Sequence, residues 1–161
     1  QRQMCIRDSA NPQVRRYFPS LLSYRRSELD MKKMDQIIKD YAIGLFSVEL
    51  KETNEWLGFI GLNYIPEDSE YPFKELPLYE IGWRLIPEVW GNGIATEGAE
   101  AVLRFAKEKG ISKVYSFTAE TNLPSRKVME KIGMTFLDHF EFPNLSKYHP
   151  LKRHVRYEID L

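Results

Sequence analysis

The sequence predicts one domain of mixed α/β class, in which a mostly antiparallel sheet carries helices on both faces. Three observations predict this fold. The 161 residues suit about one domain. A composition of 43% hydrophobic and 13% aromatic residues is rich enough to form a core. Strand-like runs follow a helix-like segment and then alternate with further helix-like segments along the chain.

Residues 1–9 have neither helical nor strand periodicity, and the chain does not begin with methionine. We therefore expect residues 1–10 to be non-native or disordered, and residues 11–161 to form the single domain. Cys5 falls in this stretch and is given no catalytic role. Apolar residues then recur at helical spacing over 28–41, which predicts an amphipathic helix with Ser27 as its N-cap.

Two more helices and six strands follow from the same patterns. A helix is expected over 96–109, ended by Gly110, and a shorter one over 125–132. Residues 66–77 contain three prolines and predict a surface loop, which either borders a binding site or only connects two strands. The β-branched and aromatic runs predict strands at 43–50, 56–65, 78–86, 113–119, 135–142 and 154–161. A polar link of five residues suits an antiparallel hairpin between the first two.

Charge and cysteine content exclude several functions. The 23 Lys and Arg residues balance 23 Asp and Glu residues, and no basic block stands alone, so neither nucleic acid nor an anionic membrane is an expected partner. One cysteine cannot form an internal disulfide, and no apolar run approaches the ~18 residues of a membrane span. We expect a cytoplasmic protein. The sequence leaves a monomer and a homodimer equally open.

The turn before the second helix has the features of an anion site. Gly91 and Gly93 permit a tight turn with exposed backbone N–H groups, and the helix N-terminus adds unpaired donors and a partial positive charge. Such a turn suits a phosphate or pyrophosphate, although it can also be a plain connection. Thr96 stands where the last glycine of the dinucleotide-binding fingerprint would be, and no P-loop Gly-Lys-Ser/Thr follows.

Four stretches together resemble the GNAT superfamily of acyl-CoA-dependent N-acyltransferases, in the branch that includes the RimJ/RimL acetyltransferases. They are Glu80–Trp83, Trp90–Glu97, Asn122–Met134 and His149–Tyr157. The resemblance covers the chain from about residue 43 onward. It implies a GNAT fold whose first strand is missing here, because that strand would precede Asn11. It also implies acetyl-CoA as the acyl donor and an amine acceptor as the other partner.

The resemblance assigns cofactor-binding roles residue by residue. The pyrophosphate loop corresponds to Trp90, Gly91, Asn92, Gly93, Ile94, Ala95 and Thr96, with Asn122 on the pantetheine arm and Ser125 beside the thioester. Strand splaying at Leu85 and Ile86 would free backbone groups for pantetheine and for the thioester oxygen. Much of the wider superfamily has Arg or Gln where Trp90 stands, so phosphate binding would depend mainly on backbone amides.

The reaction implied by the resemblance is direct attack of a primary amine on acetyl-CoA, the amine belonging to a protein N-terminus or a small molecule. Glu80 is the candidate base, and an ion pair on a solvated face, either with Arg84 or across the strands, is the equal alternative. Ser125 is the candidate acid, with a helix N-cap as its alternative, because Met129 replaces the tyrosine that the superfamily often uses. The competing function is a non-catalytic acyl-CoA sensor. The three scattered histidines lack metal-ligand spacing, so no metal is expected.

Overall fold

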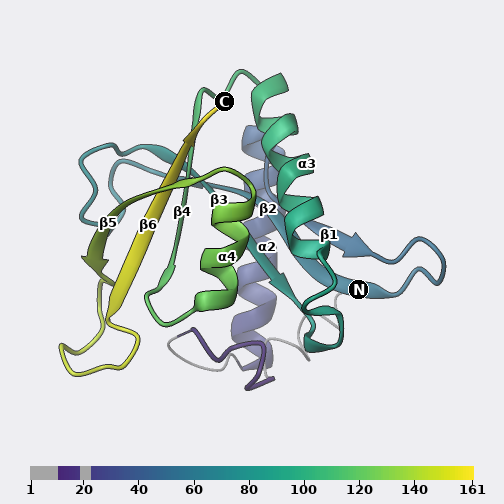
Figure 1. Ribbon diagram of the computed structural model, residues 1–161, viewed down its shortest axis with the longest axis horizontal. Helices are drawn as coiled ribbons and strands as arrows, with labels where there is room; N and C mark the ends of the chain where they lie inside the picture. Colours follow the sequence, from purple (N-terminus) through teal and green to yellow (C-terminus); the bar gives the residue numbers. More distant parts are fainter. Residues whose placement is uncertain (1–10, 19–22) are drawn as a thin grey trace.

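The computed structural model describes residues 11–18 and 23–161, and Figure 1 shows a central sheet with helices packed on it. The sheet has six strands in the order β1-β2-β3-β4-β6-β5. Their bounds are β1 Leu45–Glu49, β2 Trp56–Ile65, β3 Leu78–Leu85, β4 Lys113–Ala119, β5 Thr135–Glu141 and β6 Arg153–Asp160. The expectations about residues 1–10 and a missing first strand lie outside the described residues.

Strand pairing confirms the mixed, mostly antiparallel sheet. The pairs β1–β2, β2–β3, β4–β6 and β5–β6 are antiparallel, and β3–β4 is parallel. The first two strands form the predicted hairpin. Strands β3 and β4 are paired at one position, Glu80 with Tyr115, whereas β2 and β3 are paired along eight residues, from Gly58–Leu85 to Ile65–Leu78. The sheet is therefore divided between β3 and β4.

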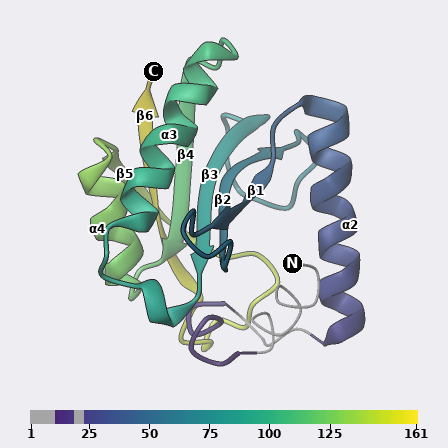
Figure 2. The same ribbon diagram turned by 90° about the vertical axis from the view of Figure 1, so that its right-hand side faces the viewer.

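Helices cover both faces of the sheet, as predicted (Figure 2). Helix α2, Tyr24–Tyr41, lies on one face, while α3, Ile94–Glu108, and α4, Leu123–Lys131, lie on the other. A short 3-10 helix, Pro87–Val89, follows β3. No helix in the described part of the chain is long and apolar enough to cross a membrane.

Helix boundaries differ from the sequence predictions because of capping. Helix α2 begins four residues before the predicted start, since the Ser23 side chain accepts the Arg26 N–H and caps the first turn. The prediction of Ser27 as the cap is therefore wrong, and Ser27 is a buried residue inside the helix. Helix α4 begins at Leu123 with Asn122 as its cap, so the N-cap alternative for Ser125 is also wrong.

The main core lies between the sheet and the α3–α4 face. Ile60, Leu62 and Ile81 from the central strands meet Ala99 and Ala106 of α3, all at most 2% exposed. A second, aromatic cluster forms around Phe73, Leu78 and Tyr115, under the 66–77 loop. Burial on this scale fixes the positions of β3, β4, α3 and α4, which carry the site described next.

Candidate active site

The gap between β3 and β4 begins just past their single registered pair. One residue past that pair on each strand, the Ser116 hydroxyl donates to the Ile81 carbonyl at 2.9 Å, and this is the last link across the gap among the described residues. Ile86 N–H donates to Leu57 O on the β2 side. Each residue of an antiparallel strand points both its N–H and its C=O to one neighbouring strand, and successive residues alternate between the two sides. Since Ile86 points to β2, Trp83 points away from β2, and its N–H and C=O face the gap.

A groove of about 500 Å³, which we call the α3–α4 groove, opens at one side of this gap. Its walls come from segment 14–18, the end of β3, the loop before α3, and the facing surfaces of α3 and α4. The lining residues are Val14, Tyr17, Phe18, Trp83, Arg84, Leu85, Val89, Trp90, Gly91, Gly93, Ile94, Ala95, Thr96, Asn122, Leu123, Pro124, Ser125, Lys127, Val128 and Lys131. All predicted cofactor-binding residues except Ile86 and Asn92 therefore line one groove.

The N-terminus of α3 presents unpaired backbone donors to this groove. Gly93 precedes the helix with φ of 82° and provides no side-chain cap, and the first intrahelical bond is from Glu97 N–H to Gly93 O. The N–H groups of Ile94, Ala95 and Thr96 consequently have no helical partner. A Cβ placed on Gly91 or Gly93, which both have positive φ, would meet no other atom within 4 Å. These features suit a bound anion.

Trp90 determines the shape of the loop before α3. Its indole N–H donates to the Leu85 carbonyl at 2.9 Å, while about half of its surface remains exposed. The Leu85 carbonyl and the Ile86 N–H, which the sequence suggested as free groups, are thus already hydrogen-bonded. By the same alternation, the Leu85 N–H faces the gap together with the N–H and C=O of Trp83. Asn92 is exposed and lies outside the groove wall.

A second space of about 390 Å³, the β3–β4 cavity, lies against the other side of the same gap. It is lined by Arg15, Tyr17, Phe18, Asp30, Met34, Leu45, Phe59, Asn63, Ile65, Tyr71, Glu80, Ile81, Gly82, Trp83, Arg84, Ser116, Phe117, Thr118, Asn122, Ser125, Met129, Phe142 and His154. The two spaces share Tyr17, Phe18, Trp83, Arg84, Asn122 and Ser125. A molecule in one can therefore meet a molecule in the other.

Glu80 lies on the wall of the β3–β4 cavity, where β3 leaves β4. Its carboxylate accepts a hydrogen bond of 2.8 Å from the Asn63 amide on β2. Burial raises the pKa of Glu80 to about 7, and the Asn63 hydrogen bond opposes that rise. Within residues 11–18 and 23–161, no cation forms an ion pair with Glu80. The alternative of a Glu80–Arg84 ion pair is not observed.

Ser125 lies where the two spaces meet, and Asn122 fixes its position. The Asn122 amide donates to the Ser125 hydroxyl oxygen at 3.0 Å and to the Thr118 hydroxyl oxygen at 2.8 Å, and its carbonyl accepts the Ser125 N–H. Both amide hydrogens of Asn122 are thus used inside the protein. Since Ser125 Oγ accepts from Asn122, its own hydroxyl hydrogen is left to donate elsewhere.

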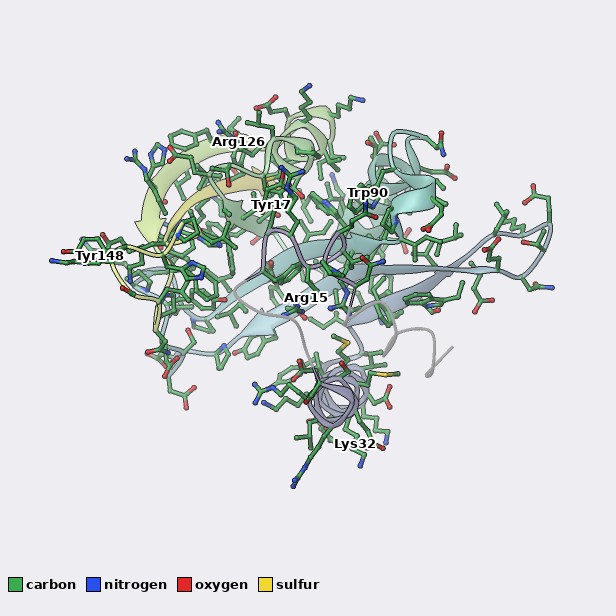
Figure 3. The ribbon with its side chains drawn as sticks, turned by 90° about the horizontal axis from the view of Figure 1, so that it is seen from below. Arg15, Tyr17, Lys32, Trp90, Arg126 and Tyr148 are labelled. Carbon is green, nitrogen blue, oxygen red and sulfur yellow. The ribbon has the colours of Figure 1, made fainter. Side chains whose placement is uncertain are left out.

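Sequence reasoning missed charged residues on both spaces. Lys127 and Lys131, four residues apart on α4, line the α3–α4 groove opposite the α3 N-terminus. Arg15 and Arg84 line the β3–β4 cavity, and Figure 3 shows Arg15 and Tyr17 centrally beneath the sheet. The i, i+4 lysine spacing was visible in the sequence. The approach of Arg15 to Arg84 across more than sixty residues was not.

Comparison with known proteins identifies the family of this chain. The sequence profile described as "Acetyltransferase (GNAT) domain" matches residues 4–135, which is most of the chain. The chain belongs to the GNAT acetyltransferase family. This GNAT domain is therefore an acyl-CoA-dependent N-acetyltransferase that uses acetyl-CoA, as the resemblance implied. Among the described residues, no group of three or more His, Cys, Asp or Glu could hold a metal ion.

Two curated relatives resemble this GNAT domain. "Uncharacterized protein YkkB" of Bacillus subtilis is 31% identical over 127 residues, or 78% of this chain and 70% of the relative. The "FsC-acetyl coenzyme A-N(2)-transacetylase" of Aspergillus fumigatus is 40% identical over 87 residues, 53% of this chain and 37% of that protein. The second match thus spans only part of each protein.

Solved structures share the fold. A GNAT-family acetyltransferase from Bacillus anthracis has a TM-score of 0.76 at 25% identity, covering 99% of this chain and 89% of that one. RimL, a ribosomal L7/L12 alpha-N-protein acetyltransferase in complex with coenzyme A, has a TM-score of 0.76 at 15% identity, covering 99% and 86%. The likeness to RimL agrees in fold with the branch to which the sequence motifs pointed.

Proposed function

We propose that this GNAT domain transfers the acetyl group of acetyl-CoA directly to a primary amine, either a protein N-terminus or a small amine. The α3–α4 groove would hold acetyl-CoA, with its pyrophosphate at the α3 N-terminus and near Lys127 and Lys131. The β3–β4 cavity would hold the amine. Transfer to nitrogen is also the activity named for the Aspergillus relative, and to an N-terminus for the RimL structure.

One observation carries the proposal: Glu80 lies partly buried on the wall of the β3–β4 cavity, and it forms no ion pair with a cation in the part of the chain that the structure describes. A primary ammonium group has a pKa of about 8 to 10, so it must lose a proton before it can attack. A carboxylate with a raised pKa is better matched to that proton than an ordinary exposed one. The pKa of about 7 places Glu80 in this range.

The proton and bond changes balance with the residues present. The ammonium gives one proton to Glu80, which passes it to solvent. The amine nitrogen then bonds to the thioester carbon, the carbon–sulfur bond breaks, and the nitrogen releases a second proton, which restores the Ser125 hydroxyl after that group has protonated the sulfur. We assign Ser125 as the donor to the leaving sulfur, because its oxygen accepts from the Asn122 amide and its own hydrogen is left to donate. A thiolate with a pKa near 8.5 needs only modest help from such an acid.

The sensor alternative is less well supported by this geometry. A sensor would be expected to neutralise Glu80 with a fixed cation, because an uncompensated carboxylate in a cavity costs stability. The observed partner is the neutral Asn63 amide. A carboxylate whose burial raises its pKa and costs stability is typical of sites that perform acid–base chemistry.

Calorimetric titration with acetyl-CoA, CoA and NADH tests the cofactor part of the proposal. We expect micromolar binding of acetyl-CoA and CoA, about −8 kcal/mol, and no binding of NADH. Absence of acetyl-CoA binding by a folded sample would overturn the groove assignment.

Ser125→Ala tests the acid. We expect kcat to fall about tenfold. Affinity for acetyl-CoA should change little, because the helix cap is Asn122 and not Ser125. Unchanged turnover by Ser125→Ala would remove Ser125 from the mechanism.

A further inference from the structure

Among the described residues, two arginines line the β3–β4 cavity. Arg84 lies near the end of β3, and Arg15 comes from segment 14–18. The Arg84 guanidinium lies 5.5 Å from the centre of the Phe59 ring, and the Arg15 guanidinium lies 4.4 Å from the centre of the Phe18 ring. Both rings also line the cavity, and both arginines are partly exposed. Figure 3 shows Arg15 between the sheet and α2. The cavity wall therefore carries two guanidinium groups, which we call the arginine pair.

The arginine pair makes this part of the cavity positive, because arginine stays protonated at neutral pH. Burial and the repulsion from Arg84 lower the pKa of Arg15 to about 10, and the attraction of Asp30 opposes them less strongly. Asp30, from α2, also lines the cavity, but its carboxylate lies 3.4 Å from the Arg26 side chain, which does not. A guanidinium has five N–H donors, so each can bind a ligand oxygen in addition to its contacts in the protein. A bound carboxylate would relieve the repulsion between the two arginines.

Gly82 leaves space between the arginine pair and the proposed base. Glu80, Gly82 and Arg84 alternate along β3, so they share one face of the strand, and all three line the cavity. A Cβ on Gly82 would lie 3.6 Å from Glu80 Oε1, whereas Asn63 donates to the other carboxylate oxygen, Oε2. Glu80 Oε1 is therefore turned toward Gly82, where β3 has no side chain. A molecule that lies over Gly82 can meet a carboxylate at one end and the arginine pair at the other.

We propose that the acceptor is a small amino acid, whose ammonium group meets Glu80 Oε1 and whose carboxylate pairs with Arg15 and Arg84. This inference rests on the proposed acetyl transfer and names its substrate class. Guanidinium groups bind carboxylates through paired, charge-assisted hydrogen bonds. The amine nitrogen bonds to the acetyl carbon, the carbon–sulfur bond breaks, and the carboxylate of the acceptor is unchanged. The products are the N-acetyl amino acid and CoA with a proton on its sulfur.

Steady-state kinetics with matched amines tests the substrate class. Each amino acid is paired with the amine that lacks its carboxylate: alanine with ethylamine, 4-aminobutyrate with propylamine, and 6-aminohexanoate with pentylamine. Alanyl-alanine amide is the peptide probe. We expect the amino acid of at least one pair to have about tenfold higher kcat/KM than its partner and to exceed the peptide, because charge-assisted hydrogen bonds are gained. Equal or higher kcat/KM for the plain amine in every pair, or a higher value for the peptide, would overturn the inference.

Substitutions of Arg15 isolate the carboxylate contact, because Arg15 lines the cavity but not the α3–α4 groove. We expect Arg15→Gln to lower the preference for the amino acid over its plain amine about tenfold, while turnover of the plain amine and affinity for acetyl-CoA persist. Arg15→Lys keeps the charge and should retain part of the preference. Arg104→Gln is the matched control, since Arg104 is exposed on α3 and lines neither space.

A purely structural role for Arg15 gives a different pattern. It would lower both activities in parallel and leave their ratio unchanged, which would contradict the proposal. Arg84→Gln is the second variant, and it should lower the same ratio. Thermal unfolding of each variant separates loss of contact from loss of fold.

Failure of the proposed function can be told apart from failure of this inference. If acetyl-CoA binds but no amine of any class is acetylated, acetyl transfer to amines is wrong and this inference falls with it. If only plain amines or the peptide are acetylated, the proposed function stands and the amino acid acceptor is wrong.

Discussion

At the scale of single residues, the site depends on polar groups whose partners are neutral. Glu80 is paired with an amide and Ser125 with another amide, so both can still exchange protons. A lysine or arginine in place of Asn63 would hold Glu80 ionised and lower its pKa. The neutral partner and the burial together set the pKa near the pH at which an amine must be deprotonated.

Replacing the proposed base should change both rate and pH dependence. We expect Glu80→Gln to lower kcat/KM for the amine by 10²–10⁴-fold, a typical range for general bases. Wild-type kcat/KM should fall as pH drops below about 7, where Glu80 becomes protonated, and the variant should lose that inflection. Calorimetry should show unchanged acetyl-CoA affinity. A variant that retains full turnover would place the base elsewhere.

The same residue makes a prediction for stability. The pKa of Glu80 rises from its usual 4.5 to about 7 on folding, so the folded state binds more protons between these values. The free energy of unfolding should therefore be highest below pH 4.5, as far as Glu80 contributes, and decrease as pH rises through 7. Glu80→Gln should abolish this decrease, of at most about 3 kcal/mol, in urea unfolding curves. Equal pH dependence in both proteins would contradict the raised pKa.

At the scale of elements, the N-terminus of α3 forms one side of the candidate site, and the 66–77 loop, which ion pairs hold in place, forms another. The α3 N-terminus provides backbone donors, which no side chain of the preceding glycine occupies. The 66–77 loop carries Tyr71 and is held to β6 by Arg156, which is 5% exposed. Arg156 pairs with Glu75 at 2.9 Å and Asp138 at 2.7 Å, and its guanidinium lies 4.3 Å from the Phe73 ring centre.

A matched pair of substitutions tests the α3 N-terminus. Asn tolerates the positive φ of Gly93 and is close in shape to Asp, so Gly93→Asn and Gly93→Asp differ mainly by one charge. We expect Asp to bind CoA about tenfold more weakly than Asn, with the difference shrinking at high salt. Calorimetry measures both affinities. Equal affinities would mean that the pyrophosphate does not sit at this helix end.

Loosening the 66–77 loop should affect one substrate only. Arg156→Lys keeps the charge but loses the paired hydrogen bonds of the guanidinium. We expect KM for the amine to rise several-fold, KM for acetyl-CoA to stay constant, and the free energy of unfolding to fall by about 1–2 kcal/mol. Arg153→Lys on the same strand is the control, because that side chain is 63% exposed. Equal changes in both KM values would argue against a role confined to the acceptor side.

At the scale of the whole molecule, the candidate site depends on a six-stranded sheet whose strands are paired side by side except where β3 and β4 separate. Four antiparallel pairs and the α3–α4 core hold the strands, while β3 and β4 register at one position and then separate. Segment 14–18, α2, the 66–77 loop and α4 all reach that gap. The α3–α4 groove and the β3–β4 cavity can therefore meet at this gap.

The last link across the gap gives a test at this scale. Ser116→Ala would leave the buried Ile81 carbonyl without the hydroxyl that now donates to it. We expect the free energy of unfolding to fall by about 1–3 kcal/mol and KM for both substrates to rise, because the gap loses its fixed width. Ser47→Ala, on exposed β1, should change neither. Wild-type stability for Ser116→Ala would show that this bond does not hold the two strands.

The sequence by itself determined the element types, the mixed sheet, the family and nine of the twenty residues that line the α3–α4 groove. These follow from local patterns: apolar periodicity, glycines beside a helix start, and motifs contiguous in the chain. It missed helix starts by two to four residues, because capping depends on which serine or asparagine side chain meets the first turn.

Only the tertiary structure decided what Glu80 and Ser125 face. A residue's pKa depends on the burial and charge contributed by neighbours distant in sequence, such as Asn63 beside Glu80 and Asn122 beside Ser125. The backbone groups that face the gap and the approach of Arg15 to Arg84 likewise need several elements brought together. Local sequence patterns specify elements, whereas packing determines which side chains share one cavity.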